Sequence, residues 1–174
     1  MNEIIKAMEE RRSIRSFKPD LPDSSDIEQI MEAGLYAPSG MGKQDVITIA
    51  VTNKEIRDRL AEDNRKIGGW KEGFDPFYGA PVILIVLARK DCFTHVYDGS
   101  LVMGNLMLAA HSLGLGSIWI HRAKEEFEME KYKKFLGELG IQGEWEGIGH
   151  CAVGYVNGEQ PEAAPRLQNR LYYV

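Results

Sequence analysis

The segment Leu101–Leu113 constrains the fold most, because apolar residues occupy nearly every face of the helix that it predicts. A helix without a polar face is normally buried, so we expect this one to form the buried centre of a domain. Gly114 follows the segment and predicts a left-handed C-cap that ends the helix. Val82–Ala88 is also apolar throughout and predicts a fully buried strand.

Weaker periodic patterns predict the elements around this core. Alternation of helices and strands predicts, by itself, a parallel α/β sheet. The irregular segment Gly68–Gly79 carries four aromatic residues among four glycines, which is typical of a binding lid and also of a plain surface loop. The other expected elements are a helix before Ser13 with Ile4, Ile5 and Met8 facing inward, a helix from a Ser25–Glu28 capping box to Pro38, a strand Val46–Val51, a helix Lys54–Lys66, a strand Ser117–His121, a helix Lys124–Leu139, a strand Ile148–Val156 and a terminal strand Leu171–Val174.

Bulk composition narrows the class of protein. A chain of 174 residues with 44% hydrophobic residues and no linker predicts one domain over residues 1–174. A net charge of −5 argues against nucleic acid and anionic membranes as partners, because neither gains from a negative protein. Two cysteines are too few for a disulfide framework, and with no basic, apolar leader we expect a cytoplasmic protein. The longest apolar stretch, Ala80–Ala88, is too short to span a bilayer.

A basic cluster follows the first predicted helix. Arg11, Arg12 and Arg15 stand with two serines within Arg11–Phe17, in an otherwise acidic chain. Guanidinium groups match the oxygens of a phosphate, and serine hydroxyls add short hydrogen bonds, so the cluster indicates a phosphorylated small molecule. The alternative is a solvated helix end, where arginine is favoured by the helix dipole.

Gly114-Leu115-Gly116 is not interpreted as a dinucleotide fingerprint. The motif follows a helix rather than a strand, and Trp119 stands where a third glycine belongs. Gly116, which has no side chain, would instead allow a ligand to approach the backbone.

Other candidate sites are weaker. Cys92, His95, His150 and Cys151 resemble a zinc set, but neighbouring strand residues point to opposite faces and cannot share one metal, so we expect none. His111 is expected in or at the edge of the core and receives no role. Because the sequence has no nucleophile elbow and no catalytic triad, any chemistry is expected to belong to a cofactor.

Several motifs together resemble the nitroreductase family of FMN-dependent oxidoreductases over essentially the whole chain. They are Arg11–Phe17, Ala37-Pro38-Ser39-Gly40 with Gln44, Asp98 before Asn105–Ala110, Leu113–Gly116, and Val153-Gly154-Tyr155 with an arginine-bearing tail. The resemblance implies an α+β fold of three layers, α/β/α, with a mainly antiparallel central sheet around a buried central helix. It therefore replaces the parallel sheet expected from alternation.

The resemblance also implies a cofactor site. The arginine cluster would hold the FMN phosphate and ribityl chain together with Arg166, the Pro38 loop would reach the flavin from the other subunit of a homodimer, and Asn64 would approach the pyrimidine edge. Gln44 and the strand Gly116–His121 would lie along the isoalloxazine. The implied FMN-binding residues are Arg11, Arg12, Ser13, Arg15, Pro38, Ser39, Gly40, Gly42, Gln44, Asn64, Gly116, Ser117, Ile118, Trp119, Ile120, His121, Arg166 and Leu167.

Four positions depart from the family pattern. Gly42 stands where asparagine is common, and Asp45 with Val46 stands where proline and an aromatic residue are common. Leu167 occupies a place that is often basic, so the phosphate contact depends more on Arg166. Only part of Gly68–Gly79 corresponds to the insertions that cover the flavin in longer family members, which implies an unusually open or small substrate pocket.

The implied function is a homodimeric oxidoreductase that transfers hydride from NADH or NADPH to FMN and reduces a small acceptor such as a nitroaromatic or a quinone. Side chains are not expected to act as catalytic acid or base. The alternatives are reduction of another small molecule, including reductive dehalogenation, and a flavin carrier without turnover. A dedicated nicotinamide or substrate clamp would discriminate between them, and the sequence shows none.

Overall fold

The computed structural model describes all 174 residues. Most predicted elements are present, with boundaries that differ by a few residues from those expected. In chain order the elements are α1 (Glu3–Glu10), α2 (Ser24–Leu35), the 3-10 helix η1 (Gly40–Gly42), β1 (Val46–Val51), α3 (Lys54–Ile67), β2 (Val82–Arg89), α4 (His95–Ser112), β3 (Gly116–Ile120), α5 (Ala123–Phe127), α6 (Glu130–Glu138) and β4 (Trp145–Gly154).

The sheet has the strand order β1-β2-β4-β3, and every neighbouring pair is antiparallel. The parallel arrangement predicted from alternation is therefore wrong, and the antiparallel sheet implied by the resemblance is confirmed. The reason lies in the connections. After β1, α3 and the irregular Gly68–Gly79 return the chain to the end where β1 finished, so Val51 lies opposite Ile83.

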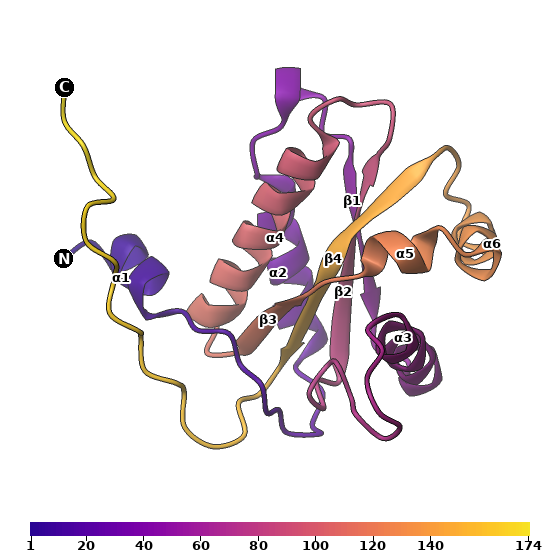
Figure 1. Cartoon of the computed structure of the whole chain (residues 1–174), viewed down its shortest axis with the longest axis horizontal. Helices are drawn as coiled ribbons and strands as arrows, with labels where there is room; N and C mark the ends of the chain where they lie inside the picture. The colour runs from indigo at the N-terminus through magenta and orange to yellow at the C-terminus, as the bar shows by residue number, and fades with distance from the viewer.

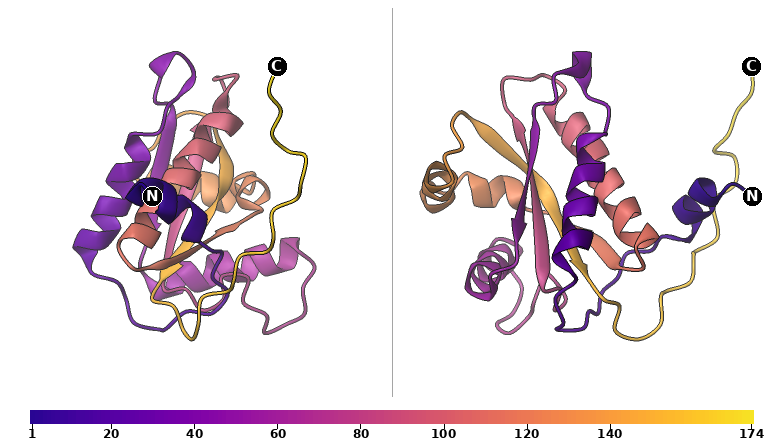
Figure 2. Two further views of the ribbon diagram at one scale, coloured as in Figure 1. Left: turned by 90° about the vertical axis from the view of Figure 1, so that its left-hand side faces the viewer. Right: turned by 180° about the vertical axis from the view of Figure 1, so that it is seen from behind.

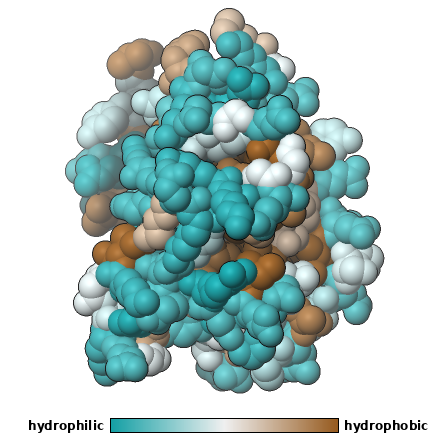
Figure 3. Space-filling view, turned by 90° about the vertical axis from the view of Figure 1, so that its right-hand side faces the viewer, coloured by the Kyte–Doolittle hydropathy of each residue, from teal (hydrophilic) through white to brown (hydrophobic).

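The sheet is covered on both faces, which confirms the three-layer α/β/α architecture (Figure 1). Strand β2 is buried along nearly its whole length and alternates its side chains between two cores. Ile83, Ile85 and Leu87 pack in the core beneath α3, α5 and α6. The neighbouring β2 residues pack in the second core, with side chains from α2 and α4. The outer surface over α3, α5 and α6 is mainly hydrophilic (Figure 3).

Helix α4 is buried on one side only. Met103 and Leu106 are fully buried against the sheet and α2, while Leu101 is 46% exposed and Gly104 is also exposed. The prediction of a helix buried on every side is therefore wrong within one chain, because nothing in this chain covers its outer face. Gly114, with φ of +76°, follows α4 in the left-handed conformation that was predicted.

Two helix predictions need correction. The second helix begins at Ser24 after Asp23, without a side-chain cap, so the Ser25–Glu28 capping box does not form. The helix expected over Lys124–Leu139 is divided into α5 and α6, because Met129 adopts an extended conformation with ψ of 138°.

Apolar residues near both ends of the chain are exposed. Ile4, Ile5 and Met8 were expected to face inward but are each more than half exposed on α1. The tail after Val156 has no regular structure, so the terminal strand Leu171–Val174 is not present, and these four residues are also exposed. The tail runs past α1 and away from the sheet (Figure 2). None of the helices is long and apolar enough to cross a membrane.

Candidate functional site

The basic cluster lies against the edge of β3. The N–H of Ile14 donates to the carbonyl of Ser117 at 3.0 Å, and Ile14 is 2% exposed. A Cβ on Gly116 would come within 2.9 Å of Ile14 Cγ1, so this glycine admits the N-terminal segment rather than a ligand. The expectation that Gly116 opens the backbone to a ligand is therefore wrong, because Ile14 occupies that space. The arginines around Ile14 are held beside an anchored stretch of backbone.

These arginines line a hollow that we call the anion pocket. Four guanidinium groups and one serine hydroxyl border it, with a single carboxylate. Nη1 of Arg11 and Nε of Arg12 are buried without a hydrogen-bond partner. None of its arginines forms an ion pair. The lining residues are Arg11, Arg12, Ser13, Arg15, Pro161, Glu162 and Arg166.

The tail brings Arg166 into the anion pocket. Nε2 of Gln160 donates to the carbonyl of Glu10 at 2.8 Å, and the N–H of Asn157 donates to the carbonyl of Ser16 at 3.0 Å. These contacts lay the tail along the N-terminal segment, more than 140 residues away in the sequence. Leu167 is 72% exposed and does not line the pocket. A cluster of unpaired cations with buried, unsatisfied N–H groups is suited to a phosphate.

The thiol of Cys151 is influenced by burial and, to a smaller extent, by the charge of Arg11. Cys151 is fully buried in β4, and burial raises the pKa of its thiol to about 12, while the charge of Arg11 acts in the opposite direction. Nη1 of Arg11 is itself buried, so part of this guanidinium lies within the protein rather than in solvent.

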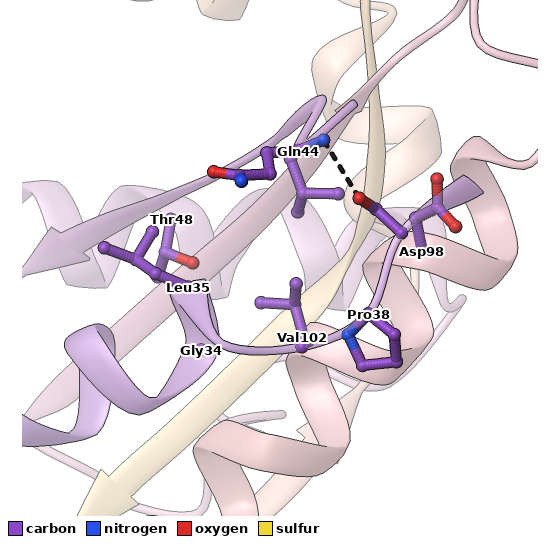
Figure 4. Close-up of a pocket in the computed structure, with 10 residues that line it drawn as sticks. Gly34, Leu35, Pro38, Gln44, Thr48, Asp98 and Val102 are labelled. Carbon is purple, nitrogen blue, oxygen red and sulfur yellow. Dashed lines mark hydrogen bonds between the residues drawn. The ribbon is translucent and has the colours of Figure 1, made fainter. Parts of the chain in front are cut away.

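A second hollow, which we call the loop pocket, lies under the Pro38–Gln44 loop (Figure 4). The N–H of Gly40 donates to Oδ1 of Asp98 at 3.1 Å, which ties the loop to the first turn of α4. The N–H of Gln44 donates to Oγ of Ser39 at 3.0 Å and closes the loop. The pocket is lined by Gly34, Leu35, Ala37, Pro38, Ser39, Gln44, Val46, Thr48, Asp98 and Val102. Gly42 does not line it, and its φ of +65° explains why glycine suits the position.

Helix η1 lies beside the start of α4 and β3 begins beyond its other end (Figure 1), so the two pockets lie at opposite ends of this helix. Asp98 fixes the loop pocket at the start of the helix, whereas Ser117 beside the anion pocket donates to the carbonyl of Met107 near its end. At 1.5 Å per residue, Asp98 and Met107 are separated by about 13 Å along the helix axis. The pockets share no lining residue. One chain therefore does not bring the predicted loop residues and the predicted arginines together.

The side chains of β3 are mostly structural. Ile118 and Ile120 pack in the core under α3, and Trp119 packs on the α4 side with its indole above Gly149. Ser117 is 1% exposed. What β3 offers to a ligand is its backbone, since these predicted site residues have no free side chain.

The free edge of β3 continues beyond the anion pocket. Because the carbonyl of Ser117 points outward to Ile14, the N–H and carbonyl of Trp119 point to the same edge. Nδ2 of Asn64 donates to the carbonyl of His121 at 2.9 Å, while its Oδ1 is buried without a partner. Asn64, which is fully buried in α3, thus contacts the residue that follows β3, whereas the arginine cluster lies beside the first residues of this strand.

Two residues at that end were not identified from the sequence. Arg122 follows His121 with φ of +79°, and its Cζ lies 4.2 Å from the ring centroid of Trp70. An arginine in the left-handed conformation is uncommon, but conformation is not visible in a single sequence. The only sequence signal was a basic residue directly after a strand.

His150 belongs to a buried pair in the core beneath α3, α5 and α6. Its Nε2 is hydrogen-bonded to a carboxylate oxygen of Glu126, and both residues are fully buried, with Phe77 edge-on at 5.3 Å. Cys151 points into the opposite core. No group of three His, Cys, Asp or Glu side chains is placed to hold a metal ion.

Comparisons with known proteins give one consistent result. The model of the nitroreductase family matches residues 8–155. A nitroreductase with bound FMN from Bacteroides fragilis superposes with a TM-score of 0.91 at 26% identity over 100% of both chains. The FMN reductase (NAD(P)H) of Bacillus subtilis is 28% identical over 170 residues, 81% of this chain and 66% of its own length. A relative from Methanothermobacter thermautotrophicus is 31% identical over 121 residues, 67% of this chain and 60% of its own length.

Proposed function

The chain belongs to the nitroreductase family, and we propose that it is a single-domain FMN-dependent oxidoreductase. In this proposal NADH or NADPH reduces the flavin, which then reduces a small acceptor such as a nitroaromatic or a quinone. The observation that carries the proposal is the anion pocket, where four guanidiniums without ion pairs meet beside an open strand edge. The names of the Bacillus subtilis and Bacteroides fragilis relatives support FMN and a nicotinamide donor.

The residues of the anion pocket fit the phosphate of FMN. A phosphate monoester carries about 1.5 to 2 negative charges at neutral pH, and Arg11 and Arg12 have buried N–H groups that lack an acceptor. Arg15, Ser13 and Arg166 border the same hollow and would complete the contact. When bound, FMN supplies the redox chemistry, and this chain supplies position and charge.

The ring system would lie along the free edge of β3. From Ser117 to His121 the edge extends about 13 Å at 3.3 Å per residue, a span that a ribityl chain and a flavin ring can cover. The outward N–H of Trp119 is available as a donor to the pyrimidine oxygens, and buried Asn64 has an unsatisfied Oδ1 at that end. The amide oxygen would accept a hydrogen bond from the ring and help to orient it, and the backbone N–H would stabilise negative charge on the ring.

A second copy of the chain would complete the site. The Pro38–Gln44 loop lies at the wrong end of α4 to reach the anion pocket of its own chain. The outer face of α4, the apolar residues of α1 and the tail Leu171–Val174 are exposed, and pairing two chains would cover them. The homodimer implied by the resemblance is therefore part of the proposal. A cytoplasmic location remains a prediction.

The function is tested by anaerobic reduction of the purified protein. We expect a yellow protein that releases FMN and not FAD on denaturation, and whose absorbance bleaches on mixing with NADH or NADPH in a stopped-flow instrument. A panel of nitroaromatics and quinones should then restore the colour. A colourless protein that cannot be reconstituted with FMN would refute the assignment, and bleaching with neither donor would favour a flavin carrier.

The two-chain site is tested by deleting residues 166–174, which removes Arg166 and the exposed tail. We expect this truncation to weaken dimerisation and FMN binding together, as measured by light scattering and by flavin titration. Arg166→Ala in the full-length chain is the matched control, because it removes the charge but leaves the tail. A truncated monomer that binds FMN at the parental affinity would show that the site lies within one chain.

A further inference from the structure

The end of α3 and the loop that follows it hold the guanidinium of Arg122 in one place. Its Cζ lies 4.2 Å from the centroid of the Trp70 ring. A Cβ on Gly68, at the end of α3, would come within 2.6 Å of that indole and 3.1 Å of Nε of Arg122, so only glycine admits this stack. Trp70 is itself fixed, because Nη1 of Arg65 donates to its carbonyl at 2.6 Å. Arg122 is therefore a positioned cation and not a freely moving surface side chain.

The guanidinium of Arg122 has no protein acceptor. The two positioned arginines of α3 differ, since Arg57 pairs with Asp58 and Asp75, and Arg65 pairs with Glu62. Arg122 forms no ion pair and no side-chain hydrogen bond, and its side chain is only partly buried. All of its N–H donors remain available to a molecule from solvent.

The backbone of Arg122 is also unusual. Its φ of +79° lies in the left-handed region that glycine adopts without strain. An arginine in this conformation makes the fold less stable than a glycine would, but it places a cation at the end of β3. Such a conformation at a ligand-accessible position is an observation from which function can be inferred.

The location relates this cation to the flavin site. Arg122 follows His121, whose carbonyl is held by Asn64 at the end of the free β3 edge. The anion pocket lies at the other end of the same edge, beside Ser117. If the phosphate of FMN occupies the anion pocket, the ring is directed toward Arg122, which is then close to molecules that stack on the ring.

We propose that Arg122 is a specificity-determining residue that binds the carboxylate of a planar, anionic acceptor. The fork of N–H donors matches a carboxylate in a bidentate contact, and the stack on Trp70 reduces the conformational entropy lost on binding. The preferred acceptors are then aromatic acids rather than neutral aromatics of the same shape. This inference rests on the proposed function, because it takes the flavin ring as the surface on which the acceptor stacks.

The test compares benzoate with benzamide, which have similar shape and differ in charge. Each is titrated into the FMN-loaded protein, and the change in flavin absorbance gives the dissociation constant. We expect the parent protein to prefer benzoate, and Arg122→Gln to weaken benzoate by about tenfold or more with little change for benzamide. Arg122→Gly is a second variant, which removes the cation while relaxing the left-handed backbone. Arg122→Lys should restore part of the preference.

Arg59→Gln is the matched control, since Arg59 is an exposed α3 arginine without an ion pair that borders the cleft between α3 and α6. Arg59→Gln should leave the dissociation constants of benzoate and benzamide unchanged. Equal loss of benzoate and benzamide in Arg122→Gln and Arg122→Gly would show a structural role, and unchanged benzoate binding would overturn the proposal. If Arg122→Gln weakened the binding of NADPH but not of NADH, the cation would instead bind the phosphate of the donor, and the proposal would be overturned.

Failure of the proposed function is distinguishable from failure of this inference. A protein that retains FMN and is bleached by NAD(P)H, but shows no Arg122-dependent preference for benzoate, refutes the acceptor site alone. A protein that does not bind FMN refutes the proposed function. In that case benzoate is titrated by calorimetry into the parent and Arg122→Gln proteins. Binding that depends on Arg122 would support an anion site at this residue. The absence of such binding would refute both the proposed function and this inference.

Discussion

The two paired arginines of α3, Arg57 and Arg65, and the arginines of the anion pocket have opposite electrostatic environments. Arg57 is almost fully buried, pairs with Asp75 and Asp58, and donates through Nε to the carbonyl of Ala80 at 3.0 Å. Arg11 and Arg12 are half-buried, have no carboxylate partner, and retain N–H groups without an acceptor. Buried charges that a fold uses for itself are neutralised within the chain, so a cluster of partly buried, unpaired arginines supports the proposal that this surface binds an external anion.

The comparison predicts that the two sets affect different measurements. Removing a paired arginine leaves a carboxylate without its partner and should reduce the free energy of unfolding. Removing an unpaired arginine removes like-charge repulsion and should leave stability unchanged while weakening the ligand.

Arg57→Ala should give the largest effect. It leaves Asp75 without its buried partner, removes the hydrogen bond to Ala80, and takes away the cation above the Phe77 ring. We expect the free energy of unfolding to fall by about 3 kcal/mol, the cost of breaking a largely buried pair, as measured by denaturant titration followed by circular dichroism. The control is Arg59→Ala on the same helix, which should change stability by less than about 0.5 kcal/mol. Similar losses in both variants would contradict the distinction between paired and unpaired arginines.

Arg11→Ala and Arg15→Ala should act on the ligand instead. Each removes a charged hydrogen bond to the FMN phosphate, so we expect the affinity for FMN to weaken by about 1.5 to 3 kcal/mol in calorimetric titration of the apoprotein. The free energy of unfolding of the apoprotein should stay close to that of the parent. Parental FMN affinity in both variants would show that these arginines are the solvated helix end that the sequence also allowed.

Glu162→Gln should strengthen the same site slightly. Glu162 is the single carboxylate among the residues that line the anion pocket, and it is exposed. Removing its charge should improve FMN affinity by about 0.3 to 1 kcal/mol, with the larger values at low salt, where surface charges are less screened. Glu159→Gln is the control, since Glu159 is also exposed and does not line the pocket. Weaker FMN binding in Glu162→Gln would place this carboxyl among the residues that hold the cofactor.

Much of the fold could be predicted because it depends on local pattern. The β-branched run Val46–Val51 and the apolar run beginning at Val82 form strands nearly as expected. The direction of strand pairing could not be predicted from alternation, because it depends on where Gly68–Gly79 returns the chain. The exposed outer face of α4 could not be predicted either, since the sequence does not show whether the core or a partner chain covers an apolar residue such as Leu101.

The candidate site shows the same limit. The arginine cluster was found because its cations are contiguous in the sequence, whereas Arg166 was identified only through the family resemblance. The stack of Arg122 on Trp70 joins residues more than 50 positions apart, and no local pattern encodes it. The assigned residues of the anion pocket lie together, but their binding of FMN stays a prediction.

The smallest effect concerns pH and Glu62, the most exposed of the carboxylates that pair with Arg57 and Arg65. Hydrogen bonds from Arg65, and then from Lys66, lower the pKa of Glu62 from its ordinary value of 4.5 to about 2. A carboxyl whose pKa is depressed in the folded state stabilises the protein above its unfolded pKa, and this contribution is lost as the pH falls from about 4.5 toward about 2. Because Glu62 is exposed, solvent screens the pair and the effect on stability is small. Thermal melts of Glu62→Gln and the parent should therefore differ slightly at pH 7 and converge near pH 2, while Arg11→Ala, which breaks no ion pair, should show no such convergence. A folded-state carboxyl resonance of Glu62 that titrates near 4.5 would contradict the pairing with Arg65.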